Sequence, residues 1–151
     1  MTLDVFDEKI LDILSRDARI SVTELSKRVG LSKTPCHARL KRLEEGGYIL
    51  GYRAIVDPVK LGREHIAFVE VKLSDTRARA LKDFNEAILK LPEVEQCHMI
   101  AGGFDYLLKI RTENIQSYRE LLGETVSALP NVAQTSTYVS MEAVKDTTTW
   151  S

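Results

Sequence analysis

Residues 19–43 read RISVTELSKRVGLSKTPCHARLKRL, and this stretch predicts two short helices joined by a tight turn. Ser21 and Glu24 have the spacing of a capping box, in which each side chain accepts a hydrogen bond from the other residue's backbone amide. Gly30 supplies the left-handed residue that ends the first helix. Ser32 is a natural N-cap for the second helix. The stretch therefore has the pattern of a helix-turn-helix.

The second helix is predicted to have one apolar face and one cationic face. Cys36, Leu40 and Leu43 recur at i, i+4 and i+7, which predicts a buried stripe. From Arg19 to Arg42 there are seven Lys or Arg and one acid, a local charge of +6 in a chain of net −1. Local charge governs contact with phosphates. The pattern favours a helix that enters a groove of DNA over a solvated face in a small bundle.

The flanking residues extend this unit on both sides. Asp4 is placed to cap a first helix, whose apolar side chains would complete a three-helix core: Phe6, Ile10, Ile13 and Leu14. After the Gly46-Gly47 pair, residues 48–56 predict a short hairpin, which would be the wing of a winged helix-turn-helix. Residues 59–64 are predicted to form a hinge.

Composition limits the classes of function. A chain of 151 residues that is 44% hydrophobic and 28% charged has enough apolar residues for the cores of one or two small domains. No apolar run is long enough to span a bilayer and no signal-peptide pattern opens the chain, so we expect a cytoplasmic protein without a membrane partner. Two cysteines, Cys36 and Cys97, do not make a disulfide framework.

The second half contains a weak internal repeat with a period of 38 residues. The motif LPEVEQ at 91–96 recurs as LPNVAQ at 129–134. The strand-like segments FVEVKL at 68–73 and YLLKIR at 106–111 match in the same way. A strand-helix-strand unit written twice predicts a ferredoxin-like β-α-β-β-α-β domain, with a four-stranded antiparallel sheet and both helices on one face. The whole chain is thus predicted to be α+β.

The repeat also predicts the boundaries of elements and domains. We expect strands at about 65–74, 94–101, 105–111 and 132–143, and helices at about 77–90 and 114–128. The sheet face without helices would carry either Phe68 or the residues that alternate with it, and such a surface favours self-association into a symmetric dimer that pairs two DNA readers. The predicted domains are a DNA-binding domain over 1–58, the hinge over 59–64, and an effector-binding and oligomerisation domain over 65–151.

The turn AGGFD at 101–105 is the best candidate for a small-molecule site. Gly102 and Gly103 would let backbone amides converge on a carboxylate, and Asp105 would bind an α-ammonium group. The alternative is a plain hairpin turn in which Asp105 caps a strand.

Other combinations of polar residues predict no catalytic or metal chemistry. The Cys-His dipeptides at 36–37 and 97–98 do not converge on an ion, because neighbouring side chains point apart on a helix or a strand. Asp105, His65 and His98 fall in no nucleophile or metal motif. We therefore expect no enzyme activity, no metal and no cofactor.

The predicted DNA contacts lie on the helix-turn-helix. Ser32 and Thr34 would bind a phosphate or base edge, as suits a helix N-terminus. The side chains that would face the groove are His37, Ala38 and Lys41, and four others would contact phosphates. The full set of predicted contacts is Ser21, Lys27, Arg28, Ser32, Lys33, Thr34, His37, Ala38, Arg39, Lys41 and Arg42. The phosphate contacts are Lys27, Arg28, Arg39 and Arg42; the alternative role of the first two is favourable charge at a helix C-terminus. A competing interpretation is an amino-acid-sensing module whose helix-turn-helix is not used on DNA.

Four motifs occur along the chain in the order of a known family: LDVFDEKIL at 3–11, ELSKRVGLSKTPCHARLKRLEEGGYI at 24–49, GGFDYL at 102–107 and TYVSME at 137–142. With them the chain resembles the Lrp/AsnC, or feast/famine, transcription regulators. The resemblance implies a winged helix-turn-helix, a ligand-sensing domain of the fold above, and an amino acid as effector. It also implies dimers that build tetramers or octamers.

The resemblance extends the predicted effector site beyond the turn. In the family this pocket lies at a subunit interface, and Ile115 would reach in from the facing subunit. The implied residues are Met99, Ala101, Gly102, Gly103, Phe104, Asp105, Ile115, Tyr138 and Ser140. Because Ser140 stands where relatives often carry an aliphatic residue, we expect a small or cyclic amino acid rather than leucine. The chain is similar overall to regulators of proline utilisation.

Overall fold

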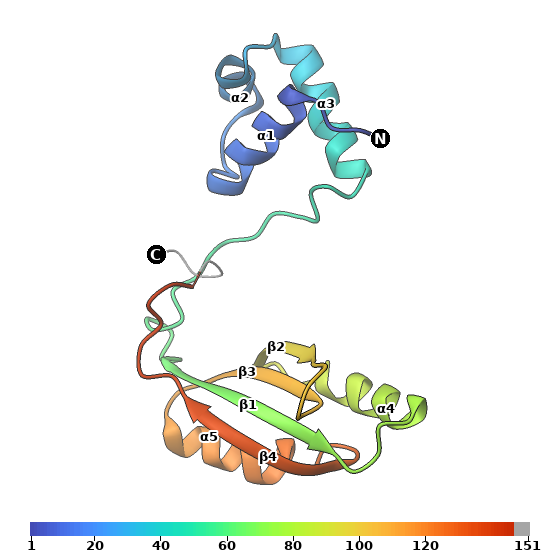
Figure 1. The fold of residues 1–151 in the computed structure, drawn as a ribbon. Helices are drawn as coiled ribbons and strands as arrows, with labels where there is room; N and C mark the ends of the chain where they lie inside the picture. The colour runs from blue at the N-terminus through green and yellow to red at the C-terminus, as the bar shows by residue number, and fades with distance from the viewer. Residues whose placement is uncertain (147–151) are drawn as a thin grey trace. The chain divides into compact units, whose positions relative to one another are not determined.

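The computed structural model describes residues 1–146, and the chain forms two compact units, Met1–Ala54 and a second that begins at Ile55 (Figure 1). The predicted boundary at residue 58 and the hinge over 59–64 remain predictions; a turn covers residues 58–62. The predicted end of the second domain, residues 147–151, lies outside the described residues. Within residues 1–146 no helix is both long and apolar enough to cross a membrane.

The first unit is the expected three-helix arrangement. It consists of α1 (Val5–Arg16), α2 (Val22–Val29) and α3 (Lys33–Glu45). Its core is made of five buried side chains: Ile10, Leu25, Val29, Cys36 and Leu43. The left-handed residue expected after α2 is present, since Gly30 has φ +80°.

The helix caps differ in part from the sequence prediction. Ser21 accepts a hydrogen bond from the Glu24 amide at 3.1 Å, but the Glu24 carboxylate faces Arg28 at 3.4 Å instead of returning to Ser21. Ser32 precedes α3 without a side-chain capping bond. The complete capping box is at α1, where Asp4 is the N-cap and its backbone amide donates to Asp7 at 3.1 Å.

The hairpin predicted over residues 48–56 is wrong. The structure has no strand between residues 48 and 57. Leu50 is 98% exposed, and Tyr52, Ile55 and Val56 are also exposed. The alternating pattern alone does not make a hairpin, because two strands that bury no apolar face against a further element are marginally stable.

The second unit has the predicted ferredoxin-like order of elements. These are β1 (His65–Leu73), α4 (Ala78–Ile88), β2 (Val94–Met99), β3 (Tyr106–Thr112), α5 (Ile115–Leu121), the π-helical turn η1 (Leu122–Val126) and β4 (Val132–Val139). The strands pair antiparallel in the order β2-β3-β1-β4. The last strand ends four residues earlier than predicted, and the second helix changes to a π-helical turn before its predicted end at residue 128.

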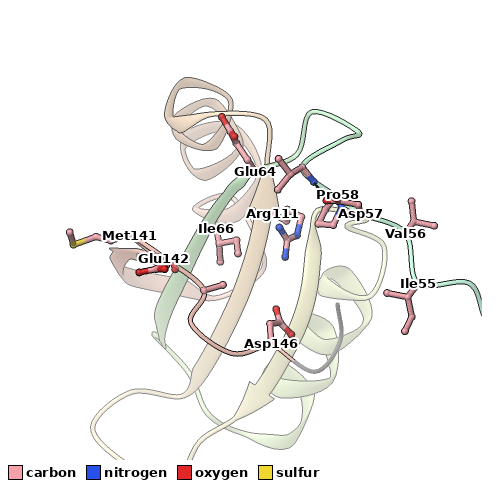
Figure 2. Close-up of a pocket in the computed structure, with 13 residues that line it drawn as sticks. Ile55, Val56, Asp57, Pro58, Glu64, Ile66, Arg111, Met141, Glu142 and Asp146 are labelled. Atoms are coloured by element: carbon pink, nitrogen blue, oxygen red, sulfur yellow. Dashed lines mark hydrogen bonds between the residues drawn. The ribbon is translucent and has the colours of Figure 1, made fainter. Parts of the chain in front are cut away.

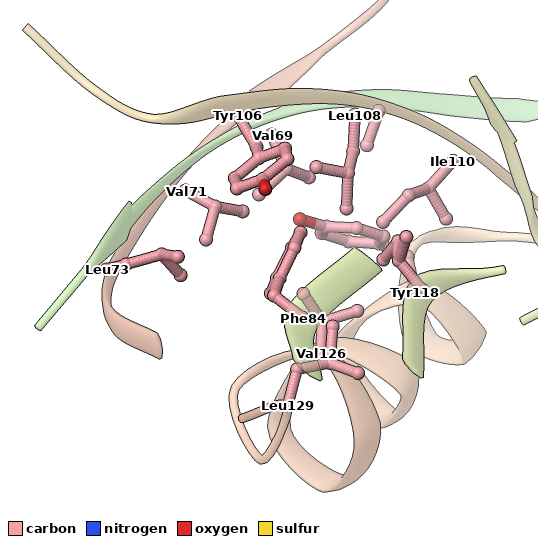
Figure 3. Packing of buried hydrophobic residues seen from close by; sticks show 12 residues of the cluster. Val69, Val71, Leu73, Phe84, Tyr106, Leu108, Ile110, Tyr118, Val126 and Leu129 are labelled. Carbon is pink, nitrogen blue, oxygen red and sulfur yellow. The ribbon is translucent and has the colours of Figure 1, made fainter. Parts of the chain in front are cut away.

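One face of the sheet packs on the two helices and holds the core, as predicted (Figure 3). Val69 and Val71 of β1 face the helices, whereas Phe68, which precedes Val69, is on the open face and exposed. The sequence repeat corresponds to repeated backbone geometry. The Leu91 amide donates to Ile88 and the Val94 amide to Leu91, and 38 residues later Val126, Leu129 and Val132 make the same two bonds.

Candidate DNA-binding helix and effector site

The outer face of α3 is exposed and cationic. Cys36 and Leu43 are buried, and the residues on the opposite face are exposed: Lys33, Thr34, His37, Ala38 and Lys41. Lys41 lies 3.8 Å from Glu45 in an exposed pair, which contributes little in water. The Ser32 hydroxyl makes no capping bond, and Ser32 is exposed at the start of the first turn, where the leading amides of a helix have no partner within the helix. Such a terminus is well suited to a phosphate oxygen.

The last turn of α2 adds two further cations. Lys27 and Arg28 are exposed. Arg28 pairs with Glu24 one turn earlier on the same helix, and both side chains are about half exposed. Since Ser21 is engaged as the N-cap of α2, only its exposed position remains in favour of DNA contact.

Arg39 and Arg42, which the sequence assigns equally to phosphates, differ in the structure. Nη1 of Arg39 lies 2.6 Å from Asp4 Oδ2 and 3.0 Å from Asp7 Oδ1, and its guanidinium stacks over the Phe6 ring at 5.2 Å. Arg42 Nη2 lies 3.3 Å from Asp7 Oδ1. The structure thus engages Arg39 in joining α1 to α3. The sequence predicts Asp4 only as a cap and does not single out Asp7, although the acids of residues 1–18 next to the basic stretch are a signal for such pairs.

The pKa of Asp4 reflects this pairing. The hydrogen bond from Arg39 and the backbone amide of Asp7 lower the pKa of the Asp4 carboxyl from 3.8 to about 2. The same bond from Arg39 to Asp4, with the bond to Asp7, raises the pKa of Arg39. Opposite charges in contact favour the charged form of both groups.

The turn at 101–105 connects β2 to β3, and Asp105 bonds to the neighbouring strand. Asp105 Oδ2 accepts a hydrogen bond from the Leu73 amide at 2.7 Å, and its own amide donates to Val71 at 2.9 Å. This is the strand-capping role that we set out as the alternative. It uses one carboxylate oxygen, and the Ala101, Gly102 and Gly103 part of the turn is exposed.

Neither glycine of this turn is required by the fold of a single chain. Gly102 and Gly103 are absent from the glycines with positive φ. A Cβ on Gly103 would meet nothing within 4 Å, and one on Gly102 would meet Ile100 Cγ2 at 3.5 Å, an ordinary contact. Two adjacent glycines without a backbone or packing reason within the chain are consistent with close approach by something outside it.

The structure divides the predicted effector residues between two ends of the sheet. The 101–105 turn and Met99 lie beside Val71 and Leu73, whereas the Ser140 amide bonds to Ile66 near the start of β1. Val71 is five residue steps along the strand from Ile66, or about 17 Å at 3.3 Å per residue. Ile115 follows the end of β3 that pairs with His65, and Tyr138 lies between the two ends, opposite Phe68. One chain therefore does not bring all nine residues together.

A cavity of about 380 Å³ lies at the Ile66 end of β1 (Figure 2). Its walls come from residues 55–59, from 140–143 with Asp146, and from the adjoining strand ends, and Arg111 is part of its lining. Nε of Arg111 donates to Glu95 at 3.0 Å. Of the predicted effector residues only Ser140 lines this cavity, which sequence reasoning did not anticipate.

The residues weighed for catalysis or metal binding have separate local partners. Asp105 binds the Leu73 amide, His65 packs on the Tyr118 ring at 5.6 Å, and His98 faces Gln96 at 3.3 Å. Burial raises the pKa of the Cys97 thiol to about 11. Within residues 1–146 no three His, Cys, Asp or Glu residues are grouped as a metal site would require.

Comparison with known proteins agrees with both units. Residues 3–49 match a winged helix-turn-helix DNA-binding family and residues 66–150 match the Lrp/AsnC ligand binding domain. The chain is 65% identical over 145 residues to a proline dehydrogenase transcriptional activator of Rhizobium radiobacter, covering 96% of this chain and 93% of that one. It is 50% identical over 143 residues to the leucine-responsive regulatory protein of Escherichia coli, covering 95% and 87%.

A solved structure gives the same result for the fold. A transcriptional regulator of Neisseria meningitidis in complex with L-Met has 32% sequence identity and a TM-score of 0.92, covering 99% of this chain and 97% of that one. These relatives are regulators, not enzymes. The exposed cationic helix and the sheet domain with its glycine turn are thus the two parts of a known architecture, and the chain belongs to the Lrp/AsnC family of DNA-binding transcription regulators.

Proposed function

We propose that this protein reads a two-fold operator with the exposed face of α3 and that a small or cyclic amino acid, bound at the 101–105 turn, alters that binding. The proposed operator lies upstream of a proline dehydrogenase gene, because a relative at 65% identity is named as the activator of that enzyme. Proline is then the first amino acid to test. A protein with this role acts on the chromosome, in the cytoplasm.

The observation that carries the effector site is the glycine pair. Gly102 and Gly103 are exposed and no contact within the chain requires them to lack a side chain. Backbone amides there are accessible to a carboxylate. The second oxygen of Asp105, beside the one that caps Leu73, is the proposed partner of the α-ammonium group.

The proposed site lies between subunits. The predicted contributors lie at different ends of β1, so a site that contains them must draw on two chains. The open sheet face supplies a surface for pairing. Phe68 and Tyr138 are opposite each other in the β1–β4 register and both are exposed. An exposed aromatic pair on a sheet favours burial against a second copy, which makes a homodimer the proposed minimum and a tetramer or octamer a larger form.

The central experiment is a salt series of DNA binding by the purified protein. The DNA is the proline dehydrogenase upstream fragment, with a scrambled fragment as control, and each titration is repeated with proline, leucine, methionine and alanine. We expect tight, steeply salt-dependent binding to the upstream fragment that proline changes most. Equal binding to both fragments would overturn the proposal of sequence-specific DNA binding. A response to leucine alone would overturn the proposal that the effector is a small or cyclic amino acid.

A glycine substitution tests the location of the effector site. Gly103→Val should leave the fold and DNA binding intact, since a Cβ at this position meets nothing within 4 Å, and should abolish the response to the effector. Gly123→Ala is the matched control, because a Cβ there also meets nothing within 4 Å. A Gly103→Val protein that responds like the wild type would exclude the turn and point to the cavity lined by Ser140.

A further inference from the structure

Arg39 and Arg42 both contact Asp7, but the two contacts differ in strength and access. Arg39 is 24% exposed, and its distances to Asp4 and Asp7 are 2.6 and 3.0 Å. Arg42 is 53% exposed, and its distances to the two Asp7 oxygens are 3.3 and 3.5 Å. Short, shielded pairs with charged partners are strong, whereas long, solvated ones are weak. Arg42 is therefore the arginine that can exchange partners.

Asp7 stays satisfied when Arg42 leaves. Its side chain is only 1% exposed, so an unpaired carboxylate there would be strongly unfavourable. Arg39 Nη1 remains at 3.0 Å from Oδ1, and the Asp4 amide donates to Oδ2 at 3.1 Å. Arg39 has no such freedom, because its departure would remove the main counterion of Asp4 and Asp7 together.

We propose that Asp7 is an internal counterion for Arg42, which a DNA phosphate displaces on binding, whereas Arg39 remains in the protein and contacts no phosphate. Asp7 is then a positioning residue that lowers the affinity for DNA of any sequence, because each complex must first separate Arg42 from it. The proposal rests on the DNA-binding role of α3 and goes beyond it by separating two arginines that the sequence treats alike.

The first test compares the two arginines by salt dependence. Each phosphate contact contributes about 0.9 to the slope of log K against log salt on duplex DNA. We expect Arg42→Gln to reduce this slope by about 0.9. Arg39→Gln should leave the slope unchanged while it lowers the thermal midpoint. Equal slopes for wild type and Arg42→Gln would overturn the proposal, as would a reduced slope for a folded Arg39→Gln protein.

The second test uses Asp7→Asn, which keeps the shape of the side chain and an oxygen that accepts the Asp4 amide. We expect affinity for a scrambled duplex to rise about two- to fivefold, the range for one partly exposed ion pair. A purely structural role predicts the opposite sign, since looser packing of α1 on α3 would weaken binding. Asp12→Asn is the matched control: it removes the same charge from the same helix at an exposed pair with Arg16.

A double variant identifies the route of the effect. If Asp7 acts through Arg42, Asp7→Asn should have no effect on affinity in the Arg42→Gln background. An equal gain in that background, or an equal gain from Asp12→Asn, would show a general charge effect and would overturn the proposal. Failure of the wild type to bind any duplex would instead overturn the proposed function.

Discussion

The two units of the chain are stabilised by different means. Among the described residues, the helical unit buries five apolar side chains in its core, and its helix ends depend on polar or conformational features such as the Asp4–Asp7 capping box and Gly30. The sheet unit buries twelve residues in one cluster between the sheet and its helices. Small cores bury less apolar surface, so local features make up a larger share of their stability. The two units should therefore respond differently to matched changes.

The largest expected effect is the loss of a large core side chain in the sheet unit. Phe84 is fully buried and its ring lies 4.3 Å from that of Tyr106. Phe84→Ala should reduce the free energy of unfolding of this unit by about 3–5 kcal/mol. Amide hydrogen exchange of the full chain in mild denaturant measures this loss of stability separately for each helix and strand. Protection should fall in β1 and α4 and persist in α1–α3; an equal fall in both units would show that they unfold together and that the comparison is wrong.

A smaller effect is expected from the end of α2. Gly30 has φ +80° and a Cβ there would meet nothing within 4 Å, so the cost of a side chain is purely conformational. Gly30→Ala should destabilise the helical unit by about 1–2 kcal/mol. Thermal unfolding followed by circular dichroism measures the change. Gly123→Ala in the sheet unit is the control and should be neutral or stabilising, because its backbone is not left-handed.

The buried tyrosine of α5 offers a matched test of polar contributions in the sheet unit. Tyr118 is buried, and its hydroxyl shares a hydrogen bond with Thr137 of β4. Tyr118→Phe keeps the ring and should reduce the free energy of unfolding by about 1 kcal/mol. Tyr138→Phe, on the exposed face, should not change it. A loss as large as that from Phe84→Ala would mean that this unit, too, depends on single polar contacts.

The parts of the fold that could be predicted are those that short-range sequence patterns determine. The 38-residue repeat predicted the sheet correctly because each copy has the same local structure. Leu91 and Leu129 both follow a helix, and each donates its amide to the residue three positions earlier and accepts from the residue three positions later. The prediction of a wing over residues 48–56 failed because it depended on more than local pattern. Leu50 and Tyr52 have strand-like spacing, but burial decides whether such residues pair, and burial depends on elements far away in the sequence.

The site was predicted less completely than the fold. The exposure of His37 and Lys41 follows from helical periodicity, which can be read directly from the sequence. The distinction between Arg39 and Arg42 does not, because their partner Asp7 is 32 and 35 residues away from them, respectively, and only the packing of α1 on α3 brings the three together. The cavity lined by Ser140 is equally a product of tertiary structure.

The smallest expected effect is the response of the helical unit to acid. The pKa of Asp4 is lowered to about 2 in the folded protein, from 3.8 without its partners. A lowered pKa in the folded state stabilises that state above the unfolded value, and the contribution is lost as the pH falls from about 4 toward 2. The carboxyl is solvated, which keeps the effect modest.

The measurement follows NMR peak intensities of backbone amides between pH 5 and pH 2. As the pH falls, the amides of α1 and α3 should lose intensity before those of β1. Asp4→Asn should already lack this contribution at pH 5 and should show a weaker dependence on pH across the same range. If α1 of the variant and of the wild type lose intensity in parallel, the Asp4–Arg39 pair does not stabilise the helical unit, and the contrast between a unit held by polar contacts and one held by its core no longer stands.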